Sequence, residues 1–483
     1  MSSAAITAWL RDLPNEFSRD IKNGPPAKRQ RRHPVTPDPS EDCAFAPMPP
    51  RAKSPAKRSA AATNDTQTLD ENDNEQTPKP AKRARSLRSD STLSSSHLSE
   101  RSSQASGQSS PRKQLQSLKL SPRGVNFQDI SFFRDKPADL KELLKRISFV
   151  MECNGILSTS RKEELIKASE SSDDFEWVNW NDNYFSDKRE ALGHTPSPED
   201  VSQVLDAAAE CNTNSHPEAN WNLEVHQLVL SLAFRPPGQR ILKHFVNFMG
   251  STQAGLIPEY THSPFAQKVD FSIYIEPGND SDPSESDSPD AIERCLRDLP
   301  DYAFNFTDFV PLERRPIALS VESKKPSEGF DRANIQLGVW LSAHWTFLRH
   351  LREISSDKVM ASAKQKTATQ QEAAMQPPLT AEEDAMVISQ DETNLELSSA
   401  KDNVFNLPSF LPGIIIQGHS WYLVVTTMEG QRTNFWHKVD IGNTQSTKGI
   451  YQIVCVLHLL RSWVEKTYWP LIYNMVTKGW PKE

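Results

Sequence analysis

Two segments of alternating polar and apolar residues, 269–275 and 317–324, most strongly constrain the fold of this chain. Each is rich in β-branched side chains, so each is predicted to form a β-strand. Residues two apart on a strand share a face, so Glu322 and Lys324 point the same way. If the strands pair with their polar faces aligned, Asp270 joins them. Two carboxylates and an ammonium in one cleft suit a divalent metal ion and an activated water.

The segment between the two strands, residues 276–316, is longer than a hairpin turn needs. It contains an acidic loop at 280–287 and a predicted helix around 291–296. The pairing of the two strands is therefore left open by the sequence alone.

Several further short sequence motifs accompany the two strands. They are the Asn-x-Thr of 305–307, the helix 335–340, the segments 441–446 and 449–454, and an N-terminal motif at 6–10. Together with the two strands they resemble a fungal group of PD-(D/E)XK nuclease-like proteins, over roughly residues 125–480. The resemblance implies an α/β fold: a restriction-endonuclease-like core with a central mixed β-sheet flanked by helices.

The same resemblance implies an active site. It makes Asp270 and Glu322 the ligands of Mg²⁺ or Mn²⁺ and Lys324 the catalytic lysine. A Gln on the next helix often completes such sites, and Gln336 occupies the matching place. The alternative for Gln336 is a buried amide bonded to backbone. A helix before the core strands often carries another acid, for which Glu224 is the candidate; the alternative is a surface Glu on an amphipathic helix.

Composition favours one large domain beside a long disordered tail. Only 36% of the 483 residues are hydrophobic, and there are 35 prolines. The predicted boundaries are 1–124 for the tail, with a short helix at 4–13, and 125–483 for the domain. Disordered inserts are predicted near 278–290 and 353–403. Five scattered cysteines without a C-x-x-C pattern indicate neither a disulfide framework nor a zinc site. No apolar run is long enough for a membrane span.

Within the predicted domain, helices are expected at 139–150, 198–209, from Trp221 onward, at 332–351 and at 449–467. In the third of these, Leu223 and His226 are expected on the apolar stripe. Further strands are expected at 414–418 and 421–426.

The tail contains short clusters of basic residues, the densest of which are Lys28, Arg29, Arg31 and Arg32, and Lys82, Arg83 and Arg85. Such clusters in an exposed segment predict binding to the nuclear import machinery and a nuclear location. They are also compatible with a loose electrostatic arm for nucleic acid, or with a solvated charge run of no function.

Charge weighs against a simple nucleic-acid-binding domain. The first 124 residues carry 21 Lys and Arg against 13 Asp and Glu, and the remainder carries 34 against 50. Nucleic-acid binding usually needs a basic footprint. Three functions therefore compete: a metal-dependent nuclease acting on nucleic acid, with DNA preferred; an inactive nuclease fold that binds nucleic acid or protein; and a nuclear scaffold that works through its tail. The oligomeric state is not predicted.

Overall fold

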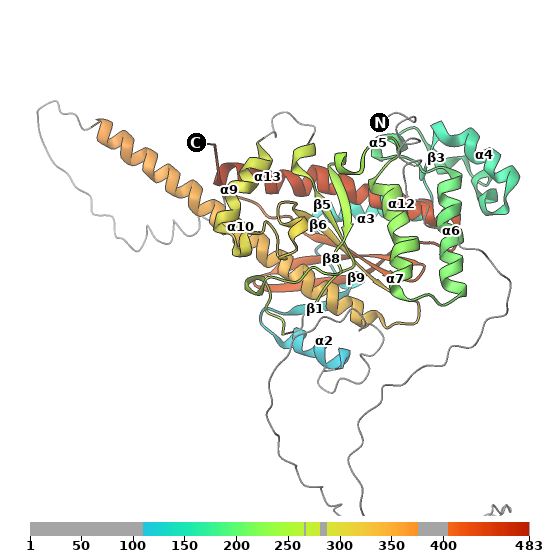
Figure 1. The fold of residues 1–483 in the computed structure, drawn as a ribbon, viewed down its shortest axis with the longest axis horizontal. Coiled ribbons are helices and arrows are strands. Elements are labelled where there is room, and N and C mark those ends of the chain that lie inside the picture. Colours follow the sequence, from blue (N-terminus) through green and yellow to red (C-terminus); the bar gives the residue numbers. More distant parts are fainter. Residues whose placement is uncertain (1–109, 265–266, 281–286, 375–403, 483) are drawn as a thin grey trace, which may run out of the picture. The chain divides into compact units, whose positions relative to one another are not determined.

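A seven-stranded mixed β-sheet forms the centre of the computed structural model, which describes residues 110–264, 267–280, 287–374 and 404–482. The strand order is β1-β9-β8-β7-β6-β5-β4 (Figure 1). The strands are β1 (Val125–Asp129), β4 (Val246–Gly250), β5 (Phe271–Ile275), β6 (Ile317–Lys324), β7 (Leu411–Gln417), β8 (Ser420–Glu429) and β9 (Arg432–Asn443). A separate two-stranded sheet pairs β2 (Leu157–Ser158) with β3 (Phe185–Ser186). The predicted α/β class with a mixed sheet is confirmed.

The two strands whose pairing the sequence left open, β5 and β6, do pair in the structure. Strands β5 and β6 run antiparallel, with Phe271 opposite Val321, despite the long connection between them. The regular register ends at Phe271, and the N–H of Asp270 donates to the carbonyl oxygen of Val321 at 3.0 Å. A bulge between Ile273 and Tyr274 shifts the pairing farther along. The strand pair thus holds the start of β5 beside the end of β6, where burial and then the charge of the nearby Asp270 raise the pKa of Glu322.

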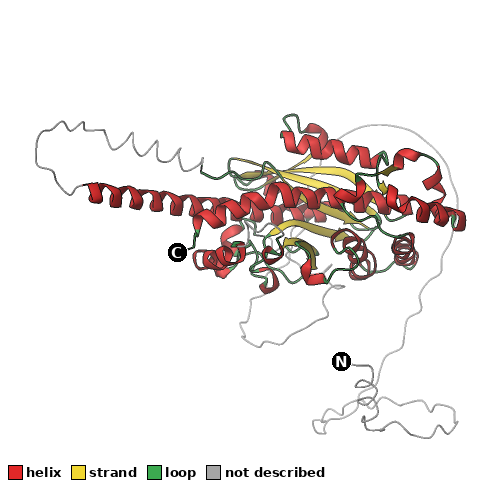
Figure 2. Cartoon of the chain, turned by 90° about the horizontal axis from the view of Figure 1, so that it is seen from above, coloured by secondary structure: helices red, strands yellow, loops and turns green. Residues whose placement is uncertain are grey.

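Helices cover both faces of the sheet (Figures 1 and 2). They are α2 (Pro111–Leu120), α3 (Ala138–Met151), α4 (Lys162–Ser171), α5 (Arg189–Leu192), α6 (Pro198–Thr213), α7 (Glu218–Trp221), α8 (Gln227–Phe234), α9 (Ser288–Cys295), α10 (Phe330–Ala374), α12 (Thr447–Trp463) and α13 (Trp469–Gly479). On one face, Trp340 and Trp345 of α10 donate indole hydrogen bonds to Ser320 and Thr426 of the sheet. On the other face, α12 packs against β9.

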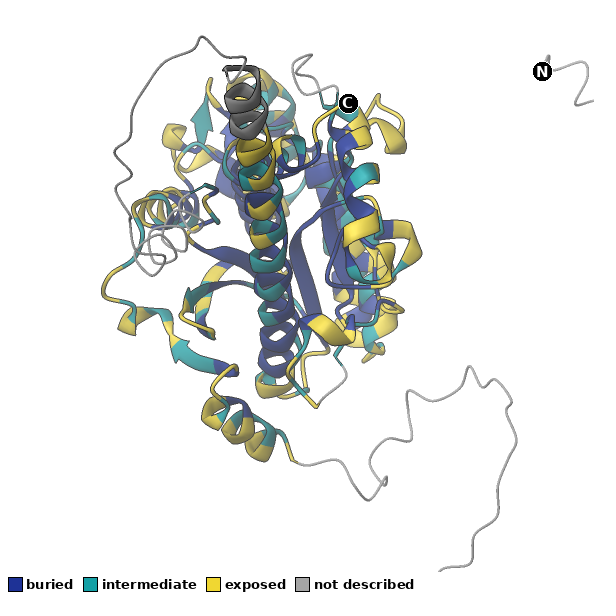
Figure 3. Ribbon diagram, turned by 90° about the vertical axis from the view of Figure 1, so that its left-hand side faces the viewer, coloured by how far each residue is buried: buried dark blue, intermediate teal, exposed yellow. Residues whose placement is uncertain are grey.

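Helix α10 continues far beyond the predicted end at residue 351, so the predicted insert at 353–403 is wrong for residues 353–374. Figure 3 shows the helix buried where it crosses the sheet and increasingly exposed toward its C-terminal end. That end is rich in Ala, Gln, Lys and Glu, which are strong helix formers and need no apolar partner to favour a helix. The periodicity of apolar residues therefore stops before the helix does.

The ordered domain also begins earlier than predicted, with α2. Leu118 of α2 is buried against Ile335 and Val339 of α10, so this segment gains the apolar contact that a short helix needs. The short helix predicted at 4–13 and the import clusters lie outside the described residues, as do 281–286 and 375–403 of the predicted inserts. Among the described residues, no helix is both long and apolar enough to cross a membrane.

Candidate active site

A cleft of about 800 Å³ opens where β5 begins and β6 ends, between the N-terminal ends of α7 and α10. Its lining combines apolar residues with polar side chains of both charges. The charged and amide side chains in it are Glu218, Asn222, Gln227, Gln253, Asp270, Lys324, Lys325, Glu328, Arg332 and Gln336. The cleft thus includes three of the four residues that the sequence singled out for catalysis, and the fourth, Glu322, lies directly beneath Lys324.

Asp270 is fixed on both of its carboxylate oxygens. Oδ1 accepts a hydrogen bond from Nδ2 of Asn222 at 3.0 Å. Oδ2 accepts from the backbone N–H of Ser323 at 2.8 Å, and the Ser323 hydroxyl lies 2.9 Å from it. The same hydroxyl lies 2.7 Å from Oδ1 of Asn222 and has a single proton to donate to one of the two. These contacts tie the end of β6 to the start of β5 and orient the carboxylate.

Glu322 and Lys324 form a buried ion pair. The Lys324 Nζ lies 2.5 Å from Oε1 of Glu322 and 2.7 Å from the carbonyl oxygen of Ser323. Glu322 is only 1% exposed and Lys324 only 5%. The shared face of Glu322 and Lys324, predicted from their spacing, is therefore present, and the lysine covers the glutamate on the cleft side.

Burial and neighbouring charge set the protonation of this group. Burial raises the pKa of Glu322 well above its usual value, and the negative charge of Asp270 adds to this. Burial disfavours the ammonium of Lys324, but the carboxylates of Glu322 and Glu218 outweigh that effect and raise its pKa. We place the positive charge on Lys324, because one ammonium stands among three carboxylates.

The helical acid that reaches the cleft is Glu218, not Glu224. Oε2 of Glu218 lies 3.3 Å from Nζ of Lys324. Burial raises the pKa of Glu218 to about 7, with a further contribution from Asp270. Glu224 is exposed and does not line the cleft. The sequence signal that was missed is the spacing of four between Glu218, Asn222 and His226, which aligns their side chains on one helix face.

A π-helical turn at Asn222–His226 lies between α7 and α8 and affects the positions of Leu223 and Glu224. A π-turn adds a residue to the helix and shifts the phase of every side chain beyond it. Leu223, expected on the apolar stripe, is consequently 63% exposed. His226 is buried as expected, and its Nδ1 lies 2.9 Å from Oδ1 of Asn222. Burial lowers the pKa of His226 to about 3, so the ring is neutral and positions Asn222, which in turn holds Asp270.

Gln336 lies at the edge of the cleft, in the first turns of α10. Its Nε2 donates a long hydrogen bond of 3.4 Å to the carbonyl oxygen of Lys268. The side chain is half-buried, so of the alternative considered above the bond to backbone is present and full burial is not. An amide at this place can orient a ligand oxygen.

The donors that could hold a metal ion here are all oxygens: the carboxylates of Asp270 and Glu322 and the Ser323 carbonyl. Magnesium prefers oxygen ligands and retains several waters, so one or two carboxylates suffice for it. No cluster of three or more His, Cys, Asp or Glu side chains suited to a metal ion occurs among the described residues. The oxygen donors at Asp270, Glu322 and Ser323 are of the kind that Mg²⁺ and Mn²⁺ prefer, and they do not resemble a structural zinc site.

Comparison with known proteins gives one clear result. The family model described as the PD-(D/E)XK nuclease superfamily matches residues 166–469, which is more than half of the chain and includes the whole cleft. No curated protein and no solved structure matched the sequence. The predicted restriction-endonuclease-like core agrees with this family and with the seven-stranded sheet. The chain belongs to the PD-(D/E)XK nuclease superfamily.

Proposed function

We propose that this protein is a metal-dependent nuclease that hydrolyses phosphodiester bonds of nucleic acid, with DNA as the preferred substrate. The observation that carries the proposal is the meeting of Asp270, Glu322 and Lys324 at one end of the β5–β6 pair, beside an open cleft. Family membership supports the same chemistry.

In this proposal Asp270 and Glu322 hold the ion, Mg²⁺ or Mn²⁺. The ion, when bound, would acidify a water and offset charge on a phosphate oxygen. Lys324 contributes a fixed positive charge next to the reacting phosphate, where a buried ammonium stabilises developing negative charge strongly. Gln336 orients a phosphate oxygen or a water through its amide.

The cleft also supplies groups that suit a polyanion. Lys325 is exposed in its lining, and Arg332 lies nearby, where its Nη1 donates to Oε1 of Glu328 at 2.9 Å. These two cations at the opening complement the phosphates of a bound strand. Glu218 adds negative charge on the opposite wall, so the strand is expected to bind along the side formed by the start of α10.

A second function is favoured by the burial of Glu322. Its carboxylate is almost fully buried and already paired with Lys324. A protein that keeps Asp270, Glu322 and Lys324 for structural reasons but does not cleave nucleic acid could have the same arrangement. The protein would then be an inactive nuclease fold that binds nucleic acid or protein. Such a module would bind strands in the cleft and leave them intact.

Cleavage assays separate the two functions. The full chain is incubated with labelled double-stranded DNA, single-stranded DNA and RNA in Mg²⁺ or Mn²⁺. We expect cleavage by the wild type and a loss of at least about a hundredfold in Asp270→Asn, Glu322→Gln and Lys324→Met, because each removes a charge at the reacting phosphate. Glu224→Gln is the matched control and should retain activity. Wild-type binding without cleavage would favour the inactive module.

We further propose that the basic clusters direct nuclear import. They lie outside the described residues, and the proposal rests on their composition alone. A fluorescent fusion of the full chain is expected in the nucleus. Replacing Lys28, Arg29, Arg31, Arg32, Lys82, Arg83 and Arg85 by Gln should move it to the cytoplasm, and an unchanged nuclear signal would refute the role.

A further inference from the structure

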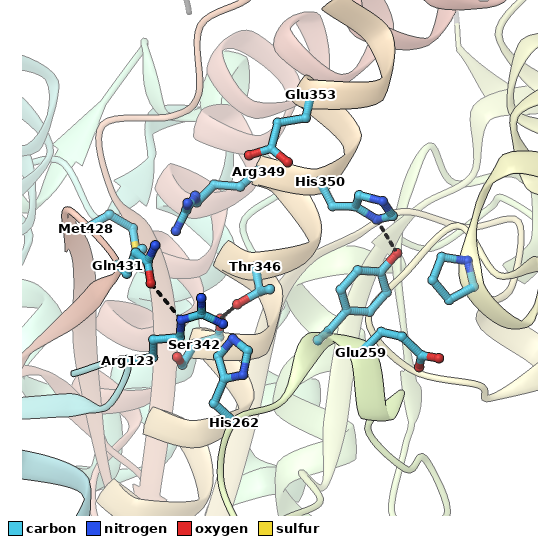
Figure 4. A pocket seen from close by; sticks show the side chains of 12 residues that line it. Arg123, Glu259, His262, Ser342, Thr346, Arg349, His350, Glu353, Met428 and Gln431 are labelled. Carbon is cyan, nitrogen blue, oxygen red and sulfur yellow. Dashed lines mark hydrogen bonds between the residues drawn. The ribbon is translucent and has the colours of Figure 1, made fainter. Parts of the chain in front are cut away.

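A second cavity, of about 340 Å³, lies beside the middle of α10. Its walls come from five parts of the chain: the segment before β1, residues 259–262, Pro300, α10, and the end of β8 with the turn that follows it. Figure 4 shows the side chains that line it. None of them lines the catalytic cleft, so this cavity is a separate feature of the molecule.

Two guanidinium groups line this cavity. Nε of Arg123 donates to Oε1 of Gln431 at 2.6 Å. The guanidinium of Arg349 extends from α10 toward the same side (Figure 4). Within the described part of the chain, neither arginine forms an ion pair. Several other arginines are paired, as Arg315 is with Glu276 at 2.7 Å.

One carboxylate of the cavity stands apart from these guanidinium groups. Figure 4 shows the carboxylate of Glu259 on the other side of the cavity from Arg123, whereas that of Glu353 lies one turn along α10, above the Arg349 side chain. Arg123 and both glutamates are exposed, and Arg349 is half-buried. The two guanidinium groups therefore supply positive charge on the side of the cavity away from Glu259.

Helix α10 adds a hydroxyl donor on the same side. Ser342, Thr346, Arg349 and Glu353 recur at intervals of three or four residues and form one stripe of the helix. The Ser342 hydroxyl accepts a hydrogen bond from Oγ1 of Thr433 at 3.2 Å, so its own proton remains available for a ligand.

The pKa of the His262 ring is sensitive to both guanidinium groups. Burial lowers the pKa of His262, and the charges of Arg123 and Arg349 lower it further. Both guanidinium groups therefore act on the same ring at the edge of the cavity. A bound anion would reverse that effect.

We propose that this cavity is a binding site for the phosphate group of a small phosphate monoester, held by Arg123 and Arg349. A guanidinium matches a phosphate with two parallel hydrogen bonds, and two of them balance the charge of a dianion. The volume exceeds that of phosphate alone and lies within the range of small-ligand pockets. The ligand is either a free monoester, such as a nucleoside monophosphate, or the terminal phosphate of a nucleic-acid strand. The site does not depend on the nuclease function.

Calorimetric titration of the full chain tests the proposal with three probes: inorganic phosphate, adenosine monophosphate and a 5′-phosphorylated oligonucleotide. The variants are Arg123→Gln, Arg349→Gln and the pair combined. Arg134→Gln is the control, because Arg134 is exposed and lies outside the cavity. The Glu322→Gln variant shows whether binding is independent of the catalytic cleft.

We expect the wild type, Arg134→Gln and Glu322→Gln to bind phosphate equally, and each arginine variant to bind about tenfold or more weakly, since one charge-assisted contact is lost. Tighter binding of adenosine monophosphate than of the oligonucleotide would identify a free monoester, and the reverse would identify a strand end. Absence of binding by the wild type, or equal binding by the arginine variants and the wild type, would overturn the proposal. Binding lost in Glu322→Gln alone would assign the phosphate to the cleft and overturn it too.

Discussion

The candidate active-site cleft and the arginine-lined cavity differ in whether their cations have ion-pair partners. In the cleft, Lys324 is buried and forms ion pairs with Glu322 and Glu218. In the cavity, Arg123 and Arg349 are more exposed and have no ion-pair partner among the described residues. The first arrangement is part of the fold, because its charges hold one another in place. In the second arrangement, the guanidinium groups of Arg123 and Arg349 are available to bind an anionic ligand. Removal of a cation should therefore affect stability at one site and binding at the other.

The largest expected effect follows from Lys324→Met, which keeps the volume but removes the charge. Glu322 would remain buried beside Asp270 without its counter-charge, and breaking such a pair costs about 3–5 kcal/mol. Because the pKa of Glu322 is raised in the folded protein, its contribution to stability is present at low pH and is lost as pH rises through the folded pKa. Urea unfolding should therefore show a larger loss at pH 8 than at pH 5. A loss that does not change with pH would contradict this account.

A smaller effect is expected for Glu218→Gln. The pKa of Glu218 in the folded protein is about 7, above its ordinary value of 4.5, so ionisation destabilises the fold as pH rises through that interval. Glu218 is 32% exposed, so solvent screening limits the effect to about 1 kcal/mol. The variant should be more stable than the wild type at pH 8, and the difference should shrink toward pH 5. Glu224→Gln, exposed two turns away, should show no such trend; equal trends in both variants would refute the assignment.

The smallest effect on stability is expected for Arg349→Gln. No ion pair is broken among the described residues, so the free energy of unfolding should change by no more than about 0.5 kcal/mol. Thermal unfolding of the variant beside Lys324→Met provides the direct contrast. A loss above about 2 kcal/mol at Arg349 would mean that this arginine is a structural group after all.

The sequence predicted the part of the fold that depends on local pattern. Alternation of polar and apolar residues located β5 and β6, which pair antiparallel, and after burial the charge of Asp270 at the start of β5 raises the pKa of Glu322 at the end of β6. Strands β1, β4 and β9 were missed. Two of them are only five residues long, and β9 contains Asn434, His437 and Asp440, so its strand character comes from pairing with β8 and β1.

The candidate site was predicted less completely, for a physical reason. Asn222 and Ser323 hold Asp270 through contacts 48 and 53 residues apart in the chain, which no local pattern reveals. Glu218 was missed because the helix was predicted to begin at Trp221, whereas α7 already begins at Glu218. The cavity at Arg123 and Arg349 joins five separate segments and had no sequence signal.

The central claim, that Asp270 and Glu322 form a divalent-ion site, is tested most directly by titrating the full chain with Mn²⁺ in a calorimeter. Circular dichroism would establish that Asp270→Asn and Glu322→Gln remain folded. We predict one binding event in the wild type that is lost in both variants, while Glu224→Gln binds like the wild type. No Mn²⁺ binding by the wild type, or unchanged binding in the folded variants, would contradict the claim.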